Sequence, residues 1–289
     1  MQLYLYAKSG HNFGLENVRR ASAIYNMLKE NDPILCTADY RAATFAKNEL
    51  NVNKGVGIDV IGNLPNVMER GDMLIYDDSG EASDTMQSHM KDYCTHLYRF
   101  GDEIPCDVVD NTFFEQTEKI NKIEKALFFA DDDYSNWFYE LSLNSNKQTL
   151  PLVLGHYFFL GNEDKLKEYF SDIIEEEEYI DTIKNTKYLL TASVNSCLES
   201  LASGNCPVYF YRKDKDIENL ENLDLLKKYN IPVIDENNLD DIIKAFENII
   251  INYPRLNKIE KFDISNIKKE ISDTLEKFKL IQPSLDYKF

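Results

Sequence analysis

The chain has 289 residues and a formal net charge of −18 at pH 7, with 43% hydrophobic and 12% aromatic residues. This length exceeds that of one typical domain and favours two, and the apolar content supports a packed core and argues against global disorder. The negative charge argues against a sequence-independent grip on nucleic acid, because phosphates are repelled and no run of Lys or Arg offsets the acidity.

Targeting and redox signals are absent from the sequence pattern. The opening residues 1–10 show no charged region followed by an apolar core and a cleavage site, and no stretch approaches the roughly 20 apolar residues of a membrane span. The five cysteines are odd in number and lack C-x-x-C spacing, which disfavours a disulfide framework and a zinc site. We therefore expect a cytoplasmic protein with reduced thiols, no transmembrane segment and no bound metal.

The first half alternates short apolar runs with amphipathic segments, which is typical of a sheet covered by helices. We expect strands over 2–7, 33–38, 72–78 and 95–104, and helices over 16–31 and 38–50. The helix over 16–31 should bury one stripe, because apolar side chains recur in it at helical spacing. That stripe comprises Val18, Ala21, Ile24, Tyr25 and Leu28.

A polar segment over 114–125 separates this unit from a second alternation of the same kind. We expect strands over 126–130, 150–155, 186–192, 207–211 and 231–234, and helices over 193–204, 220–230 and 238–253. The sequence therefore predicts an α/β fold with two Rossmann-like domains facing a cleft. The predicted domains are residues 1–122 and 123–253, followed by a C-terminal helix in 254–289 that packs back on the body.

Two acidic runs stand out. The run at 173–180 predicts a solvated helix face, because consecutive side chains of a helix point in different directions. Asp131, Asp132 and Asp133 follow a predicted strand, at the sheet edge where ligands gather in open α/β folds. A turn cap is the favoured role for these carboxylates, with a Mg²⁺ site as the alternative.

The segment 191–208 carries the strongest site signal of the second half. A strand, a small polar turn and a helix start present backbone N–H groups and a positive dipole end, which suit a diphosphate. Ser193, Asn195 and Ser196 are the candidates for this cradle, and Glu199 lies where its carboxylate can accept hydrogen bonds from ribose hydroxyls. The alternative is structural, because Ser196 and Glu199 also match the capping box S-x-x-E.

This segment resembles the nucleotide-sugar motif in the C-terminal domain of GT-B fold proteins, in which a Glu stands five residues before a glycine turn, as Glu199 does before Gly204. Within that superfamily the chain resembles the family of UDP-sugar hydrolases of the pseudaminic acid pathway, and beyond it the glycosyltransferase of the peptidoglycan lipid precursor. Three segments carry the resemblance: the opening strand, glycine loop and helix; "DEIPCDVVDNTFF"; and "KALFFADDDYSNWF". It implies a GT-B type fold and a nucleotide-activated sugar as the ligand.

Aligned on the opening segment, the resemblance implies loop and helix residues that contact the substrate. It matches Ala7, His11, Gly14, Val18 and Arg20 to the family pattern. Asn17 then stands where the family has its catalytic His, which acts as a base and must titrate near neutral pH. An amide cannot serve, so His11 or the neighbouring carboxylate of Glu16 is the alternative base, although Glu16 replaces a loop glycine and would repel a diphosphate. Gly14 and Arg20 are the substrate-binding candidates here.

Other polar residues carry weaker signals. His156 faces either the cleft or the core, and packing is the favoured reading. Asp77 and Asp78 end a predicted strand and suit caps, metal ligands or a base. Asp216 and Asn219 are weak candidates for holding a sugar.

Two functions compete at this level. The first is a nucleotide-sugar-processing enzyme, a glycosyltransferase or hydrolase of surface-glycan biosynthesis, with no cofactor and no nucleic acid partner. The second is a non-catalytic GT-B-like descendant that acts as a ligand sensor or a protein-interaction scaffold, because the expected base is missing and Glu16 stands in the loop. A weaker third reading is an unrelated doubly wound protein with a small-molecule effector.

Overall fold

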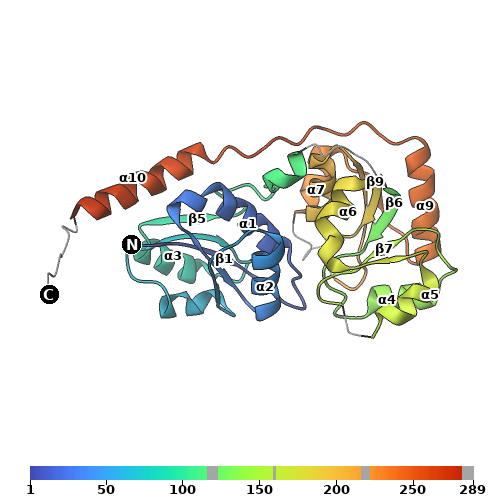
Figure 1. The fold of residues 1–289 in the computed structure, drawn as a ribbon, viewed down its shortest axis with the longest axis horizontal. Helices are drawn as coiled ribbons and strands as arrows, with labels where there is room; N and C mark the ends of the chain where they lie inside the picture. The colour runs from blue at the N-terminus through green and yellow to red at the C-terminus, as the bar shows by residue number, and fades with distance from the viewer. Residues whose placement is uncertain (116–122, 159–160, 216–221, 282–289) are drawn as a thin grey trace. The chain divides into compact units, whose positions relative to one another are not determined.

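A computed structural model describes residues 1–115, 123–158, 161–215 and 222–281 (Figure 1). By its contacts the chain divides into two compact units. Unit 1 comprises Met1–Lys8, Asn17–Val108 and Phe262–Phe289, and unit 2 comprises Ser9–Glu16 and Val109–Lys261. The loop 9–16 therefore belongs with the second half of the chain, whereas the sequence assigns it to the first domain. The sequence predicts a domain boundary after residue 122. Residue 122 is the last of the range 116–122, which lies outside the described residues.

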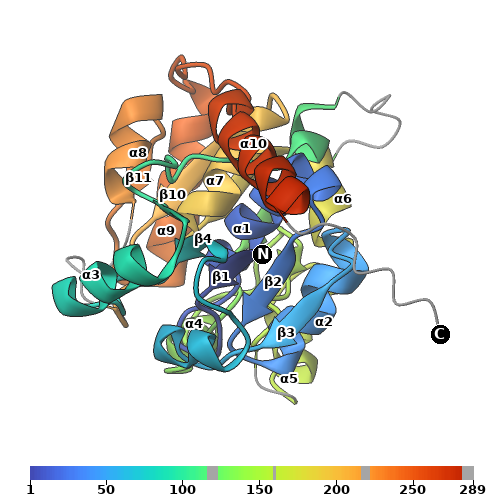
Figure 2. The ribbon, with the colours of Figure 1, turned by 90° about the vertical axis from the view of Figure 1, so that its left-hand side faces the viewer.

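Unit 1 is built on one parallel sheet with the strand order β3-β2-β1-β4-β5. Its strands are β1 (Leu3–Ala7), β2 (Ile34–Thr37), β3 (Gly55–Gly57), β4 (Met73–Asp77) and β5 (His96–Arg99). Figure 2 shows β4, β1, β2 and β3 in that order across the sheet. In register, Leu5 of β1 lies between Leu35 and Ile75 of its neighbours. Neighbouring parallel strands are joined by helices, as a doubly wound fold requires.

Strands β1 and β4 are buried along their whole length because both faces of the sheet are covered, and Asp77 at the end of β4 is their one charged residue. The helices are α1 (Glu16–Met27), α2 (Tyr40–Glu49) and α3 (Asp84–Tyr93). Strands β1, β2, β4 and β5 and helices α1 and α2 confirm elements expected from the sequence pattern.

Helix α1 differs from its prediction in two ways. The side chains 17–25 are all buried, so the helix has no solvated face. It ends at Met27 and continues as a short 3-10 turn, Lys29–Asn31, which Asp32 closes with a left-handed φ of 53°. The strand β3 and helix α3 had no strong signal, because β3 reads Gly-Val-Gly and α3 buries no residue.

Unit 2 contains a second parallel sheet, with the order β11-β10-β9-β6-β7-β8. Its strands are β6 (Ile123–Phe128), β7 (Leu152–Val153), β8 (Ile173–Ile174), β9 (Thr186–Thr191), β10 (Cys206–Phe210) and β11 (Val233–Ile234). Counted from β6, this is the strand order 3-2-1-4-5-6 of a Rossmann fold.

Two cores cover the faces of the second sheet. Neighbouring residues of one strand point to opposite faces, so Leu127 joins one core while Phe128 joins the other. Side chains of α4 (Trp137–Leu143), α5 (Glu163–Tyr169) and α9 (Leu239–Ile251) pack in the first core. Those of α6 (Tyr179–Asn185), α7 (Val194–Ala202) and α8 (Leu223–Tyr229) pack in the second, and Figure 1 shows α6 and α7 across the sheet from α9.

The last described helix, α10 (Ser265–Ile281), belongs to unit 1. Its Glu270 accepts a hydrogen bond from the Tyr98 hydroxyl at 2.6 Å, and Thr274 contacts Nε2 of His96 at 2.8 Å. These contacts tie the helix to β5, an edge strand of the first sheet.

Candidate functional site

The strand order of unit 2 locates a candidate site. Strands β6 and β9 lie side by side, and their connections leave toward opposite edges of the sheet. In open α/β sheets, ligands bind beyond the carboxyl ends of the strands at such a switch point. The segments that follow β6 and β9 contain Asp131, Asp132, Asp133 and Ser193, and all four residues are buried.

The three aspartates after β6 have different environments. The carboxylate of Asp133 accepts backbone hydrogen bonds from Phe138 at 3.0 Å and Tyr139 at 2.9 Å, so it caps the start of α4. Burial raises the pKa of this carboxyl group, and the two backbone hydrogen bonds oppose the shift. The favoured turn-cap interpretation is thus confirmed for Asp133. In the described part of the chain, no three His, Cys, Asp or Glu side chains are placed to hold a metal ion.

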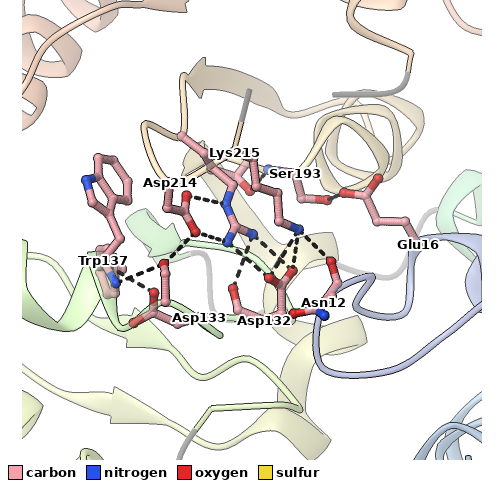
Figure 3. Close-up of polar contacts among 12 residues, drawn as sticks. Asn12, Glu16, Asp132, Asp133, Trp137, Ser193, Asp214 and Lys215 are labelled. Atoms are coloured by element: carbon pink, nitrogen blue, oxygen red, sulfur yellow. Dashed lines mark hydrogen bonds and ion pairs between the residues drawn. The ribbon is translucent and has the colours of Figure 1, made fainter. Parts of the chain in front are cut away.

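Asp132 belongs to an ion-pair cluster of Asp132, Arg212, Asp214 and the half-buried Lys215 (Figure 3). The Arg212 guanidinium donates to both oxygens of Asp132 at 2.9 and 3.0 Å and to both oxygens of Asp214 at 3.0 and 2.6 Å. It also lies over the ring of Phe129, with its central carbon 4.5 Å from the ring centroid. Such two-pronged pairing fixes the loops after β6 and β10 relative to each other.

Charge pairing in this cluster is reflected in the pKa values. Burial disfavours the charged form of Arg212, yet the hydrogen bond to Asp214 and the charge of Asp132 raise its pKa. Burial would raise the pKa of Asp214, but the hydrogen bond and charge of Arg212 lower it overall. Both groups are therefore ionised at neutral pH.

The loop 9–16 contacts the same sheet edge. Lys215 donates from Nζ to the Asn12 carbonyl at 3.0 Å and pairs with Asp132 at 3.1 Å, as Figure 3 shows. Gly14 has a φ of +70°, and a Cβ at this position would lie 3.2 Å from the Cβ of Asp131. A glycine is needed here for the backbone conformation and for this close approach. His11 is exposed, and its ring meets that of Tyr157 edge-on at 5.1 Å between centroids.

Glu16, the last residue of the loop, reaches the start of helix α7. Ser193 is the N-cap of α7 and donates from its hydroxyl to Oε1 of Glu16 at 2.5 Å (Figure 3). Sequence reasoning placed this carboxylate at the start of α1, where Glu16 is indeed the first residue. Only the structure shows that the carboxylate also meets the N-terminus of α7.

Three hydroxyl groups lie in close contact at the start of helix α7. The Ser193 oxygen accepts from the Ser196 hydroxyl at 2.9 Å, and Ser196 contacts the Tyr179 hydroxyl at 2.6 Å. Tyr179 in turn donates to Oε2 of Glu199 at 2.5 Å, and the Asn195 amide donates to Oε1 of Glu199 at 2.8 Å. This hydroxyl chain, which comprises Ser193, Ser196 and Tyr179, connects the carboxylates of Glu16 and Glu199.

The capping-box alternative for Ser196 and Glu199 is wrong. The N-cap is Ser193, whose side chain accepts from the Ser196 N–H, and the helix begins at Val194. Glu199 lies too far along the helix to cap it, so its carboxylate turns to Tyr179 and Asn195. The side chain is 3% exposed.

The remaining candidates of the first motif lie in unit 1. The Asn17 amide donates to the Ser79 hydroxyl at 2.6 Å and accepts from Arg20 at 2.7 Å, and Arg20 pairs with Asp77 at 2.8 Å. Asn17 and Arg20 are buried. Both side chains are therefore bonded within their own unit.

Weaker candidates also have structural partners. Asp78 accepts from the Ala82 N–H at 2.6 Å and pairs with Arg99 at 3.4 Å. The ring of His156 packs edge-on against Tyr157, which agrees with the favoured packing interpretation. Asp216 and Asn219 lie outside the described residues.

Sequence reasoning missed Arg212 and Tyr179. Arg212 stands in the charged segment after β10, where the alternation of Arg, Lys and Asp matches no motif. Tyr179 ends the acidic run at 173–180, which was interpreted as a solvated face, yet it is 2% exposed. An aromatic residue at the end of an acidic run was the one available signal.

Comparisons with known proteins give a fold but no family. No protein-family profile matches the chain, and no curated protein matches it by sequence. Among solved structures, the chain is similar to the UDP-GlcNAc 2-epimerase of Methanocaldococcus jannaschii in complex with UDP-GlcNAc and UDP. The TM-score is 0.51 and the identity 12%, over 96% of this chain and 100% of that chain.

Two further structures score below 0.5. One is the Neisseria meningitidis UDP-GlcNAc 2-epimerase bound to UDP-GlcNAc, with a TM-score of 0.49 and 13% identity over 96% of this chain and 100% of that chain. The other is the glycotransferase of kitacinnamycin, with a TM-score of 0.48 and 10% identity over 96% of this chain and 95% of that chain. The first comparison and the strand orders establish the predicted fold class, α/β of the GT-B type with two Rossmann-like domains. Across the described ranges, no helix is both long and apolar enough to cross a membrane.

Proposed function

We propose that this protein binds a nucleotide-activated sugar and hydrolyses it or transfers its glycosyl group, in cytoplasmic steps of surface-glycan biosynthesis. The observation that carries the proposal is the hydrogen bond between Glu16 and Ser193. It brings the loop 9–16, which holds the candidate bases, to the helix start that is the candidate phosphate site. The resemblance to the pseudaminic-acid-pathway hydrolases makes hydrolysis the first reaction to test.

The geometry around α7 supports the proposed binding roles. The N-terminus of a helix favours a phosphate through its backbone N–H groups and dipole, and Ser193, Asn195 and Ser196 are buried there. The Glu199 carboxylate is held in place by Tyr179 and Asn195. A carboxylate offers about four lone-pair positions, so it can take ribose hydroxyls beside these two donors.

The reaction needs a base near the anomeric carbon, which lies beyond the phosphate as seen from the ribose. His11 and Glu16 stand in the loop that contacts this edge, and His11 is solvent-exposed. A histidine titrates in the range that general base catalysis requires. We assign the base to His11 first and to Glu16 second. Asn17 has no titratable group, and its side chain bonds to Ser79 and Arg20 of unit 1.

One observation favours the non-catalytic alternative, a sensor or scaffold with a protein partner. Asn17 replaces the titratable residue of the family pattern and is bonded to both Ser79 and Arg20. If the active site is rebuilt around His11, the protein should bind the nucleotide sugar and turn it over. If the site is inactive, the protein should bind the same ligand without turnover. Turnover therefore decides between the two functions.

The test is calorimetric titration of the full chain with uridine and cytidine nucleotides and their sugars, followed by an assay of nucleotide release over hours. Glu199→Gln should weaken binding at least tenfold, because one acceptor oxygen is replaced by a donor amide. Glu168→Gln is the control, since this exposed acid of α5 makes the same charge change. The melting temperature of each variant verifies folding.

The outcomes separate the alternatives. Turnover that is lost in His11→Ala supports the enzyme, and binding without turnover supports the sensor. The absence of binding by all of these ligands would remove the nucleotide-sugar function.

A further inference from the structure

The tip of the loop 9–16, residues 11–13, is exposed. It forms a tight turn, because the N–H of Gly14 donates to the Gly10 carbonyl at 2.8 Å. Exposed loops open most readily in folded proteins, since few packed side chains hold them. The place of His11 at this sheet edge therefore depends on the groups that hold the tip.

Lys215 contacts the middle residue of this tip. Its ammonium donates to the Asn12 carbonyl at 3.0 Å and pairs with the Asp132 carboxylate at 3.1 Å, as Figure 3 shows. An ammonium carries three donor protons, so one nitrogen can serve both acceptors. The loop and Lys215 both belong to unit 2. Lys215 thus ties the tip of the loop to the segment after β6.

Asp132 is a fixed anchor for this lysine. Arg212 donates to its two carboxylate oxygens at 2.9 and 3.0 Å, and to its backbone carbonyl at 3.2 Å. Two parallel N–H···O bonds from one guanidinium fix the orientation of a carboxylate. Because its acceptor is held in this way, Lys215 has a defined position from which it bonds to the loop.

The ring of His11 lies against the same segment. It meets the ring of Tyr157 edge-on, with 5.1 Å between centroids, and the Tyr157 N–H donates to the Asp131 carbonyl at 2.7 Å. Tyr157 also pairs with Asp132 in an isolated β-bridge. The His11 ring and the Lys215 ammonium therefore share one support, the segment after β6.

We propose that Lys215 is a positioning residue, which holds the tip of the loop 9–16 so that His11 stays at the carboxyl edge of the second sheet. This rests on the proposed function, in which His11 is the first candidate for the base. A base must lie within hydrogen-bonding reach of the proton that it removes, and a misplacement of about 1 Å can lower a rate about a hundredfold. Lys215 acts on the reaction through the position of the loop.

The experiment compares the wild-type chain with Lys215→Met, Lys215→Arg and the control Lys213→Met. Methionine removes the charge and the donors, whereas arginine can still donate to both acceptors. Lys213 pairs with Asp235 and is as exposed as Lys215, at 30% against 28%. Melting temperatures verify that the variants fold.

Amide hydrogen exchange of peptides that cover 9–16 measures opening of the loop without any ligand. We expect exchange to become about fivefold faster in Lys215→Met and to stay close to that of the wild type in Lys215→Arg and Lys213→Met.

Nucleotide release from the uridine and cytidine nucleotide sugars measures turnover. We expect kcat to fall about tenfold in Lys215→Met and to recover in Lys215→Arg. The affinity for the free nucleotides should change by about twofold or less, because the candidate phosphate site lies at α7 and not at the loop tip.

Each outcome bears on the proposal separately from the proposed function. Unchanged exchange in Lys215→Met overturns the proposal, and so does faster exchange with an unchanged kcat or an equal effect in Lys213→Met. If the wild type releases no nucleotide, the enzymatic function fails, while the exchange rates still decide whether Lys215 holds the loop.

Discussion

The two sheets share a strand order around their switch points, but their carboxyl ends are built differently. In unit 1 the segment after β4 is closed by pairs within the unit, since Arg20 holds Asp77 and Arg99 holds Asp78. In unit 2 the segment after β9 leads directly into a helix whose N-cap, Ser193, meets a carboxylate from the loop 9–16. Both edges thus carry buried ion pairs, and the edge of unit 2 adds a hydrogen-bonded helix start, which is the candidate phosphate site.

The difference arises from the residues that follow each strand. After β4 the chain passes through Ser79 and Gly80, both with positive φ, and α3 starts only at Asp84. After β9 only the turn 192–193 precedes α7, so its N–H groups lie at the sheet edge. The same strand order thus places a helix start directly at the edge of one sheet and a longer turn at the edge of the other.

The largest effect is expected from removing the buried ion pairs at the edges of the two sheets. Arg212→Met and Arg20→Met should each lower the free energy of unfolding by about 3–5 kcal/mol, because each removes the arginine that pairs with buried carboxylates. Urea unfolding measures this loss. Lys227→Met, which removes an exposed pair with Asp224, is the control and should leave the midpoint nearly unchanged.

A comparison of the two arginine variants sharpens the contrast. The folded fraction of Arg20→Met should bind nucleotides as the wild type does, because Arg20 bonds to Asp77 and Asn17 of unit 1. A loss of affinity in that variant would show that the edge of unit 1 also takes part in binding.

An intermediate effect is expected at Asn17. Asn17→His should lower the free energy of unfolding by about 1–3 kcal/mol, since the imidazole replaces an amide that both donates to Ser79 and accepts from the Arg20 cation. The variant should gain no hydrolytic activity, because the ring would lie beside Arg20 and be buried. Thermal unfolding and nucleotide release measure the two effects, and an increase in turnover would contradict the structural role of this position.

The smallest expected effect concerns how the free energy of unfolding changes at acidic pH. Arg212 lowers the pKa of Asp214 below its ordinary value of about 3.8, so its folded pKa lies below the unfolded one. The resulting stability is present above the unfolded pKa and is lost as the pH falls through the folded pKa. The stability gap between wild type and Asp214→Asn should thus be constant above about pH 5 and shrink toward about pH 3.

Unfolding curves measured across that range test this sign. A gap that grows on acidification would mean that burial, which raises the pKa, outweighs the pairing with Arg212.

The sequence predicted the sheets well and the contacts within the candidate site only partly. Alternation of buried strands and amphipathic helices is a local pattern, so β1, β4, β6, β9 and α7 were found from neighbouring residues alone. Short or solvated elements such as β3, β8 and α3 carry no such pattern. The residues Ser193, Asn195, Ser196 and Glu199 were identified because they lie within one segment of consistent chemistry.

What the sequence determined by itself was therefore the α/β alternation, the polar turn at α7 and the absence of a titratable group at Asn17. Tertiary structure alone decided that Glu16 meets Ser193, 177 positions away in the chain, and that Tyr179 bonds Glu199. It also decided that Arg212 joins the loops after β6 and β10. Periodicity reports which face of an element is buried, whereas the partner across a sheet edge depends on strand order, which no local pattern encodes.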